Sequence, residues 1–520
     1  MRIASLSEFL LMRIERRPDT TLSTASSATK STSDNGVKTA ANVPLNRQIY
    51  QLIREAILTH LLPSGLQLPS SRDLARELAL SRNTVTYAYE QLIAEGYLET
   101  RSGAGTFVAD TTPDLLPAGR LIASPLTDAS EQSELSALGA QLIQQAGASD
   151  LQWGAFMPGV PDITLFPNKI WSRLQNKHWR RAQPELLTYG NAGGYMPLRE
   201  AVAEYLRIAR SVNCNANQVI ITTGVHQSLD IVVKLLGEHG DRAWVEDPCY
   251  WGTRSVLNSL GVKAVPIPVD AEGMCMQLAD LPQPPRFICT TPSHQYPLGM
   301  VMSLSRRRTL LEYAASRKVW IIEDDYDSEF RYDSRPLAAL QGMDTHNRVL
   351  YMGTFSKTMF PSMRIGFMVV PEALATAFAT GVSELYRGTQ VFIQAIMADF
   401  MTEGHFAAHI RRMRILYAER LQLLQAAIRD HFGDRITLSG GEAGLHLALG
   451  LPQHSDDVAI SQAALAIGIA VRPLSRYYMD ADNARNGLLL GYACVPNDQI
   501  RPAFDKLAVI IKRHWHDFLA

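Results

Sequence analysis

Cysteine is scarce in this chain, and it is scattered. Five cysteines are spread over 520 residues, and no two of them form a C-x-x-C pair. An odd number of unclustered cysteines argues against a disulfide framework and against a zinc site, and it indicates reduced thiols in the cytoplasm. The formal net charge is also small, at -1. Any affinity for nucleic acid therefore has to come from a local basic patch.

Long apolar runs are missing as well. No uninterrupted apolar stretch reaches the roughly 18 residues from which a transmembrane helix is inferred. Residues 5–14 are mildly amphipathic, but no small-residue cleavage site follows a proper apolar core, which argues against a signal peptide. Apolar residues make up 46% of the chain and charged residues 19%, as in soluble globular proteins. A length of 520 residues predicts more than one domain.

Shifts in composition divide the chain into four segments. Residues 1–43 end in a stretch rich in serine, threonine and alanine, which predicts a flexible arm. Residues 44–110 carry helical periodicity and form the first ordered block. Residues 111–150 contain several prolines and small residues, with one weak helical stretch, and predict a linker. Residues 151–520 form the second and larger block.

The first block predicts three helices followed by a hairpin. An apolar face recurs at helical spacing after Pro44, Ser70 resembles the N-cap of a second helix, and Ser81 resembles that of a third. Residues 97–108, with Gly103 in the turn, predict two short strands. In a helix-turn-helix, the first turn of the recognition helix enters the major groove and meets base edges. That turn is polar here: Arg82, Asn83 and Thr84.

Three-helix modules more often pack without contacting nucleic acid. In this block, however, the polar turn and the glycine hairpin occur together with Arg72, Arg82 and Arg101. An arginine can donate two parallel hydrogen bonds to a guanine, and serine hydroxyls or main-chain amides can hold phosphates. The combination favours a DNA-binding domain whose hairpin is a wing.

In the second block, one lysine follows a predicted buried strand. The apolar run 349–355 predicts the strand, and Lys357 stands in the uncharged, hydroxyl-rich turn after it. Open α/β sheets bind ligands at the carboxyl ends of their strands. A lysine that loses solvation there has a lowered pKa, and its amine can condense with an aldehyde. Thr354 and Ser356 offer hydroxyls, and Arg364 offers a fixed cation, as a phosphate would require.

A second strand end supports a cofactor site. The apolar run 319–322 ends in an acidic cluster that contains Asp324 and Tyr326. A pyridine cofactor that works as an electron sink needs a carboxylate to keep its ring nitrogen protonated, and it benefits from a phenol near its ring hydroxyl. Asp324 and Tyr326 would supply both groups. Without this second stretch, Lys357 is equally well explained as a surface lysine in a turn.

At these two stretches the sequence resembles the cofactor site of class I aminotransferases, which use pyridoxal 5'-phosphate (PLP). Together with the first block, residues 44–515 resemble the MocR/GabR subfamily of GntR-type transcriptional regulators. The resemblance implies an α/β protein with an N-terminal winged helix-turn-helix. Its second block would be a PLP fold-type I domain with a mixed, mostly parallel sheet, helices on both faces and a small C-terminal α+β subdomain.

The resemblance also implies the roles of individual residues. Lys357 would form a Schiff base with PLP, and main-chain amides at the helix start after Gly224 would bind the phosphate. Tyr189 matches a tyrosine that reaches the cofactor of the neighbouring subunit in aminotransferases, which implies a homodimer. The implied cofactor-binding residues are Lys357, Asp324, Tyr326, Tyr250, Val225, His226, Thr354, Ser356, Arg364 and Tyr189. The implied DNA-binding residues are Arg72, Ser81, Arg82, Asn83, Thr84 and Gly103.

Two departures from the aminotransferase pattern bear on turnover. Tyr296 stands where typical aminotransferases carry an asparagine that bonds the ring oxygen. The run 488–490 lacks the arginine that clamps a substrate carboxylate, which leaves Arg472 or Arg476 as substitutes for an effector carboxylate. Physiological transamination is therefore left open by the sequence.

The reading that these motifs favour is a cytoplasmic, PLP-dependent regulator. It would bind double-stranded operator DNA and sense PLP itself, or a small amine or amino acid, through an aldimine at Lys357. One alternative is an active class I/II aminotransferase with an appended DNA-binding domain. Another is a regulator whose effector domain has lost its cofactor, although the complete set of lysine, aspartate and arginine argues against that.

Overall fold

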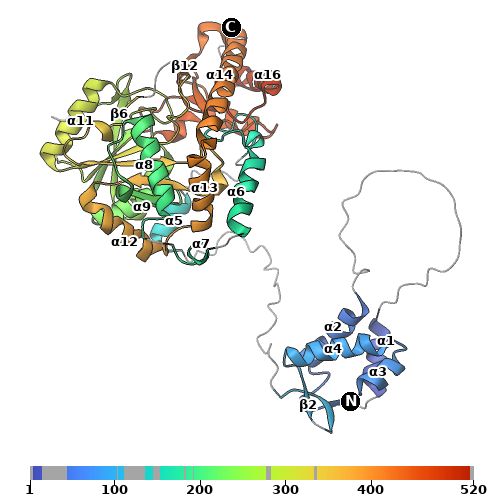
Figure 1. Ribbon diagram of the computed structural model, residues 1–520. Coiled ribbons are helices and arrows are strands. Elements are labelled where there is room, and N and C mark those ends of the chain that lie inside the picture. Colours follow the sequence, from blue (N-terminus) through green and yellow to red (C-terminus); the bar gives the residue numbers. More distant parts are fainter. Residues whose placement is uncertain are drawn as a thin grey trace. The chain divides into compact units, whose positions relative to one another are not determined.

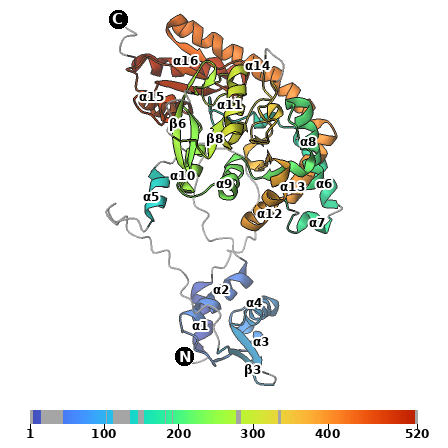
Figure 2. The ribbon, with the colours of Figure 1, turned by 90° about the vertical axis from the view of Figure 1, so that its left-hand side faces the viewer.

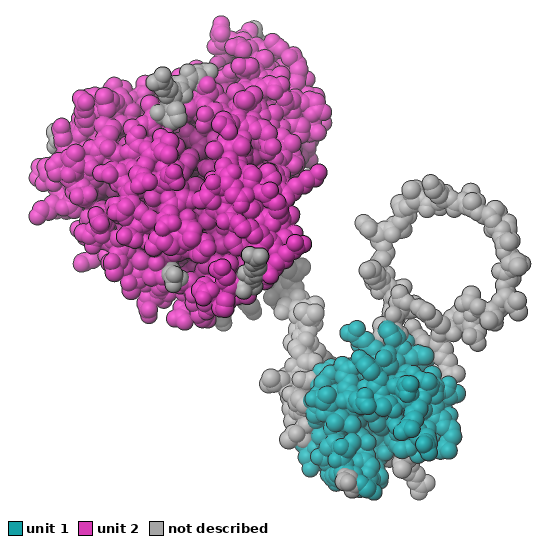
Figure 3. Space-filling model, in the orientation of Figure 1, with its two compact units in different colours: residues 1–132 teal, residues 133–520 magenta. Residues whose placement is uncertain are grey.

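The computed structural model describes residues 4–14, 44–101, 103–110, 135–144, 153–180, 183–190, 192–276, 283–332 and 337–515. The chain divides into two compact units, which are residues 1–132 and residues 133–520 (Figure 3). Within these described ranges, no helix is long and apolar enough to cross a membrane.

Unit 1 is the predicted winged helix-turn-helix (Figure 1). Its helices are α1 (Ala4–Arg13), α2 (Leu45–Leu58), α3 (Ser71–Glu77) and α4 (Arg82–Ala94). Its antiparallel sheet has the order β1 (Gln67–Leu68), β3 (Gly105–Val108), β2 (Leu98–Arg101). Ser70 Oγ accepts a hydrogen bond from the Asp73 amide at 3.1 Å, and this caps α3. Ser81 Oγ accepts one from the Thr84 amide at 3.2 Å and caps α4, so both predicted helix starts are confirmed.

The N-terminal segment departs from the prediction. Residues 1–43 were expected to be a flexible arm, but residues 4–13 form α1, and for them the expectation is wrong. Leu6 and Leu10, four residues apart on one helix face, are buried in the core of unit 1 with exposed fractions of 4% and 0%. Ser7 also donates a hydrogen bond to Glu77 at the end of α3. Residues 15–43, which carry the rest of the expected arm, lie outside the described residues.

Unit 2 is built on an eight-stranded sheet. Its strand order is β4 (Val219–Thr222), β11 (Gly366–Val369), β10 (Val349–Thr354), β9 (Trp320–Asp325), β8 (Phe287–Thr290), β5 (Arg242–Asp247), β6 (Lys263–Asp270), β7 (Gly273–Met274). The five strands from β10 to β6 are parallel to one another, whereas β11 is antiparallel to both of its neighbours and β7 is antiparallel to β6. The predicted mixed, mostly parallel sheet is confirmed.

Helices cover both faces of this sheet (Figures 1 and 2). One face carries α9 (Val225–Leu236), α10 (Trp251–Ser259) and α12 (Ala375–Tyr386). The other carries α8 (Met196–Arg210), α11 (Leu304–Arg317) and α13 (Val391–Thr402), with α6 (Asn168–Arg180) and α7 (Pro184–Leu187) packed on α13. In β10, Leu350 and Met352 join the first core and Tyr351 joins the second, so the alternation of a strand fills both layers. The short helix α5 (Ala137–Gln144) packs against α10.

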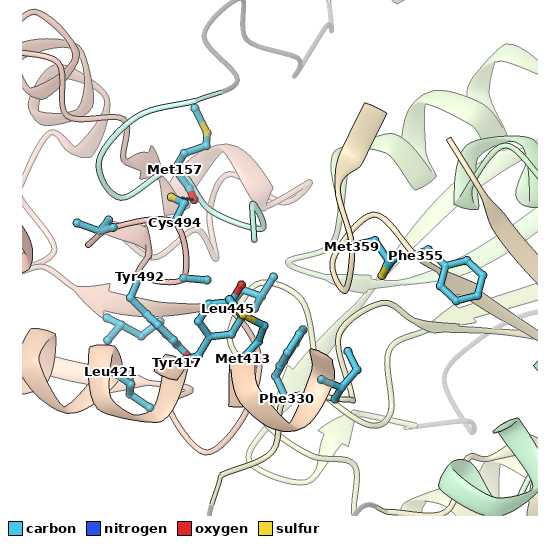
Figure 4. Close-up of a cluster of buried hydrophobic side chains, with 14 of the residues drawn as sticks. Met157, Phe330, Phe355, Met359, Met413, Tyr417, Leu421, Leu445, Tyr492 and Cys494 are labelled. Carbon is cyan, nitrogen blue, oxygen red and sulfur yellow. Dashed lines mark hydrogen bonds between the residues drawn. The ribbon is translucent and has the colours of Figure 1, made fainter. Parts of the chain in front are cut away.

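A smaller subdomain completes unit 2. Its antiparallel sheet has the order β12 (Thr437–Ser439), β13 (His446–Gly450), β15 (Gly487–Gly491), β14 (Arg472–Pro473). Its helices are α14 (His405–Phe432), α15 (Asp457–Leu465) and α16 (Asn497–Arg513). Figure 4 shows Tyr417 of α14 beside Phe330, which follows β9, and the two ring centroids are 5.1 Å apart. Shared apolar packing thus joins the subdomain to the strand ends of the large sheet.

Candidate functional site

The carboxyl ends of β9 and β10 open into a cavity of about 290 Å³. The start of α9, the start of α10 and the loop after β8 complete its walls. The cavity is lined by Gly224, Val225, His226, Tyr250, Tyr296, Asp324, Tyr326, Thr354, Ser356, Lys357, Pro361 and Arg364. Nine of the ten cofactor-binding residues expected from the sequence are therefore brought together, because parallel strands present their carboxyl ends at one edge of a sheet.

Lys357 lies in the turn that follows β10 and lines this cavity. Its Nζ donates a hydrogen bond to the carbonyl oxygen of Gly159 at 2.8 Å. Gly159 has a φ of +70°, and a Cβ at that position would lie 2.9 Å from Nζ, so glycine allows the close approach. Burial lowers the pKa of the Lys357 ammonium, while the carboxylates of Asp327 and Asp324 act in the opposite direction. A lowered pKa increases the neutral, nucleophilic fraction of the amine.

Asp324 is the carboxylate of the cavity. Its Oδ1 is buried and has no hydrogen-bond partner among the residues that the structure describes. Burial raises the pKa of Asp324 to about 7, repulsion from Asp325 adds to the rise, and Lys357 opposes it. A buried carboxylate oxygen without a partner is unfavourable. Asp324 therefore fits a ligand that brings a proton donor into the cavity, as a protonated pyridine nitrogen does.

The start of α9 forms an anion-binding corner with Arg364. Gly224, with a φ of +134°, precedes the first turn of this 12-residue helix, and it lines the cavity together with Val225 and His226. The first main-chain amides of a helix have no partner within the helix and can bind an anion. A Cβ at Gly224 would lie 3.7 Å from two guanidinium nitrogens of Arg364, so the cation stands close to the helix start. Within the described part of the chain, Arg364 forms no ion pair. Together with the Thr354 and Ser356 hydroxyls, this corner fits a phosphate.

Three tyrosines form the aromatic wall of the cavity. The Tyr250 hydroxyl lies 2.9 Å from His226 Nε2, and burial together with Arg364 lowers the pKa of His226. The Tyr296 ring packs edge-on against Tyr250 with centroids 5.8 Å apart. The Tyr326 hydroxyl lies 2.8 Å from Nδ1 of His294, which no sequence motif above indicates. The available signal is its position two residues before Tyr296.

Three expected residues do not line the cavity. Tyr189 is 73% exposed, and its ring lies under the Arg387 guanidinium at 4.9 Å. Arg472 is half-buried, with Nη2 3.8 Å from the sulfur of Met157. Arg476 is exposed. The roles expected for these residues, in a neighbouring subunit's site or on an effector carboxylate, stay predictions.

Unit 1 presents its candidate site on the surface. Arg72, Arg82 and Asn83 are exposed, and neither arginine forms an ion pair with a described residue. Arg76 and Arg101, by contrast, pair with Asp73 and Glu99. The hydroxyl of Ser81 serves the N-cap of α4, so its expected contact with DNA competes with a structural role.

Comparison with known proteins assigns each unit to a family. Residues 45–108 match the family model of bacterial regulatory proteins of the gntR family, and residues 164–507 match that of class I and II aminotransferases. The "Probable rhizopine catabolism regulatory protein MocR" of Rhizobium meliloti is 40% identical, over 90% of this chain and 94% of the relative. This chain belongs to the MocR subfamily of GntR-type transcriptional regulators.

Other relatives agree with this assignment of the MocR-type chain. The pyridoxine biosynthesis transcriptional regulator PdxR of Corynebacterium glutamicum is 30% identical, over 89% of this chain and 94% of the relative. Among solved structures, the kynurenine aminotransferase of Pyrococcus horikoshii superposes with a TM-score of 0.64 at 26% identity, over 73% of this chain and 95% of the enzyme. The regulators match both units, whereas the enzyme matches unit 2, so this protein is a DNA-binding regulator built on an aminotransferase fold.

Proposed function

We propose that this MocR-type regulator binds PLP in the cavity at Lys357. PLP itself, or a small amine or amino acid that enters the cavity, then changes the affinity of unit 1 for operator DNA. The observation that carries the proposal is the convergence of three complementary groups on one cavity. These are an amine with a lowered pKa at Lys357, a carboxylate oxygen without a partner at Asp324, and the anion-binding corner at Arg364.

Different residues of the cavity would contact different parts of PLP. When bound, PLP supplies an aldehyde that condenses with primary amines and a ring that withdraws electrons. Arg364 and the amides of Val225 and His226 would hold its phosphate. At the other end, Asp324 Oδ1 would accept a hydrogen bond from a protonated ring nitrogen. Lys357, between the two, offers its amine, and Tyr250 closes one face and excludes water.

Signalling requires that the ligand prefer one conformation of the regulator over another. The start of α10 follows Tyr250 of the cavity directly, and α5 packs on α10. Along the chain, α5 is the described element of unit 2 that stands nearest to unit 1. A ligand that presses on Tyr250 is thus coupled through α10 to the segment that leads to the DNA-binding unit.

The proposal includes a homodimer. Trp179 at the end of α6, Leu187 at the end of α7 and Tyr189 are 52%, 57% and 73% exposed. Both helices pack on α13, and the Trp179 ring lies against Phe392 of α13 at a tilt of 38°, with centroids 4.4 Å apart. Exposed apolar groups gathered on neighbouring elements indicate an interaction surface. A homodimer that covers them also matches the two-fold symmetry of a typical operator.

The visible absorption spectrum tests the cofactor proposal. Purified full-length protein and the Lys357→Ala variant are each mixed with PLP and then passed over a desalting column. We expect a retained visible band in the wild-type protein and none in the variant. A band of equal strength in Lys357→Ala, or no band in either protein, would contradict the proposal.

A further inference from the structure

Three buried side chains behind Tyr326 do not line the cavity. They are His294 in the loop after β8, Asp327 after β9, and His446 at the start of β13 in the smaller subdomain. Their exposed fractions are 3%, 1% and 1%. Three polar side chains from three separate elements therefore meet where the large sheet and the subdomain join, directly behind the cavity wall.

One ring nitrogen organises this cluster. Nδ1 of His294 lies 2.8 Å from the hydroxyl oxygen of Tyr326 and 3.0 Å from Oδ1 of Asp327. A ring nitrogen carries at most one proton, and an ionised carboxylate can only accept a hydrogen bond. Both contacts are satisfied together in the tautomer whose Nδ1 carries a proton and donates it to Asp327. In that tautomer Nδ1 offers no lone pair to the Tyr326 hydroxyl, whose own proton is then directed toward the cavity that Lys357 lines.

We propose that His294, oriented by Asp327, is a positioning residue that directs the hydroxyl proton of Tyr326 into the cavity. The proposal rests on the proposed function, because Tyr326 and Lys357 line the same cavity. In this arrangement Tyr326 always offers a donor to an oxygen of the ligand. It thereby fixes how readily a nitrogen next to that oxygen keeps its proton.

The surroundings of His294 preserve this arrangement. His446 packs against it with ring centroids 5.5 Å apart, and burial and His294 keep the pKa of His446 well below its usual value, so His446 is neutral. Tyr296 lies edge-on to Tyr326 at 5.4 Å. The titratable groups that face the pair are Asp327 itself and, toward the cavity, Lys357, Asp324 and Glu246, besides the neighbouring Tyr296.

A glycine leaves space for the side chains of His294 and Asp327. Gly444, with a φ of +81°, lies against both side chains. A Cβ there would come within 2.5 Å of Asp327 Oδ2 and would collide with the His294 ring. Moreover, His294 Nε2, Asp327 Oδ2 and His446 Nδ1 make no hydrogen bond to any described residue. Several buried polar atoms without partners are costly for a purely structural cluster, and they are typical of functional sites.

The test is a pH titration of the visible spectrum of the PLP-loaded, full-length protein. Four proteins are compared: wild type, His294→Asn, Tyr326→Phe and the double variant. The quantity compared is the pH at which the change of the visible band is half complete, called the midpoint. An asparagine oxygen accepts the Tyr326 proton and withdraws it from the cavity. We therefore expect His294→Asn to shift this midpoint by about one pH unit, in the same direction as Tyr326→Phe. In the double variant the midpoint should equal that of Tyr326→Phe alone, because His294 acts through the hydroxyl.

His409→Asn is the matched control. His409 is also buried, at 5% exposed, and its Nε2 donates to the Thr358 carbonyl at 3.0 Å, away from Tyr326. We expect this variant to leave the midpoint unchanged. A second readout needs no cofactor: in nitrogen-15 histidine-labelled protein, the Nδ1 proton should give a protected downfield NMR signal. The signal should persist in Tyr326→Phe and disappear in Asp327→Asn.

The outcomes separate the two proposals. The positioning role alone would be overturned if His294→Asn had the same midpoint as the wild type. It would also be overturned if the shifts caused by His294→Asn and Tyr326→Phe added up in the double variant. The same conclusion follows if the protected Nδ1 signal is missing or survives Asp327→Asn. A wild-type protein without any band would instead overturn the proposed function.

Discussion

The two units carry their candidate sites in opposite environments. In unit 1 the arginines expected to meet DNA, Arg72 and Arg82, are exposed on the surface. In unit 2 the residues around Lys357 are enclosed, and burial shifts the pKa values of Lys357 and Asp324. An exposed site recognises a large, highly charged partner through many weak contacts. An enclosed one recognises a small ligand through a few strong contacts.

Removing the central amine of the enclosed site should have the largest effect. We expect Lys357→Ala to abolish the retained PLP band and to leave DNA affinity in the absence of PLP unchanged, because Lys357 lies in unit 2. The measurements are absorption after desalting and fluorescence anisotropy with labelled DNA. Lys263→Ala, which removes an exposed lysine of the same unit, should keep the band. An equal loss of the retained PLP band in both variants would mean that PLP reacts with surface lysines.

The stability of unit 1 should depend on the helix that the sequence did not predict. Leu10 is fully buried, and Leu10→Ala is expected to lower the free energy of unfolding of unit 1 by about 3 kcal/mol. Met12 on the same helix is 86% exposed, so Met12→Ala should have little effect. Denaturant unfolding followed by circular dichroism measures both. If Leu10→Ala unfolds at the wild-type midpoint, α1 does not belong to this core.

The pH dependence of stability should distinguish the units. The pKa of Asp324 is raised to about 7 from an ordinary value of 3.8, so between these pH values the unfolded chain releases a proton that the folded chain retains. Stability of cofactor-free unit 2 therefore falls as pH rises through this window and levels off above about pH 7. Asp324→Asn should reduce this slope by about 1.4 kcal/mol per pH unit.

Thermal and denaturant unfolding at pH 5, 6, 7 and 8 measures that slope. Glu200→Gln, at an exposed carboxylate of α8, is the control and should keep the wild-type slope. The separate transition of unit 1, which does not contain Asp324, should be the same in Asp324→Asn as in the wild type. A wild-type slope in Asp324→Asn would mean that this carboxyl does not retain its proton in the fold.

The smallest effect is expected from a substitution on the exposed DNA-binding surface of unit 1. Arg82→Ala should weaken DNA binding by about tenfold, since one arginine contact to a base is worth roughly 1–3 kcal/mol. Arg76→Ala is the matched control, because Arg76 is exposed in α3 but paired with Asp73. Anisotropy titrations at several salt concentrations measure both. Equal losses in the two variants would point to a general charge effect instead of a contact made by Arg82.

Local patterns predicted most of the scaffold. The caps at Ser70 and Ser81 and the strand before Lys357 depend on neighbouring residues, so the sequence contains them directly. Helix α1 was missed because its apolar face is short and is stabilised by α2 and α3, which are distant in the chain. His294, Asp327 and His446 were missed for the same reason, since 152 positions separate the first from the last.

The position of a charged side chain was harder to predict than its presence. Arg472 and Arg476 were chosen to replace a missing arginine of β15, yet neither lines the cavity. Their side-chain directions depend on how the smaller subdomain packs on the large sheet, which no local pattern encodes. Tyr189 is exposed in the single chain, and its expected role involves a second copy.

The most direct test of the account is the coupling between the units. DNA selected from a random pool by the full-length protein is labelled, and its affinity is measured by anisotropy with and without PLP, and then with PLP plus a panel of primary amines. We predict that PLP or one of the amines changes the affinity of the wild-type protein at least about fivefold. The same additions should leave Lys357→Ala unchanged. An affinity that no addition alters in the wild type, or one that changes equally in Lys357→Ala, would contradict the claim that the cavity controls DNA binding.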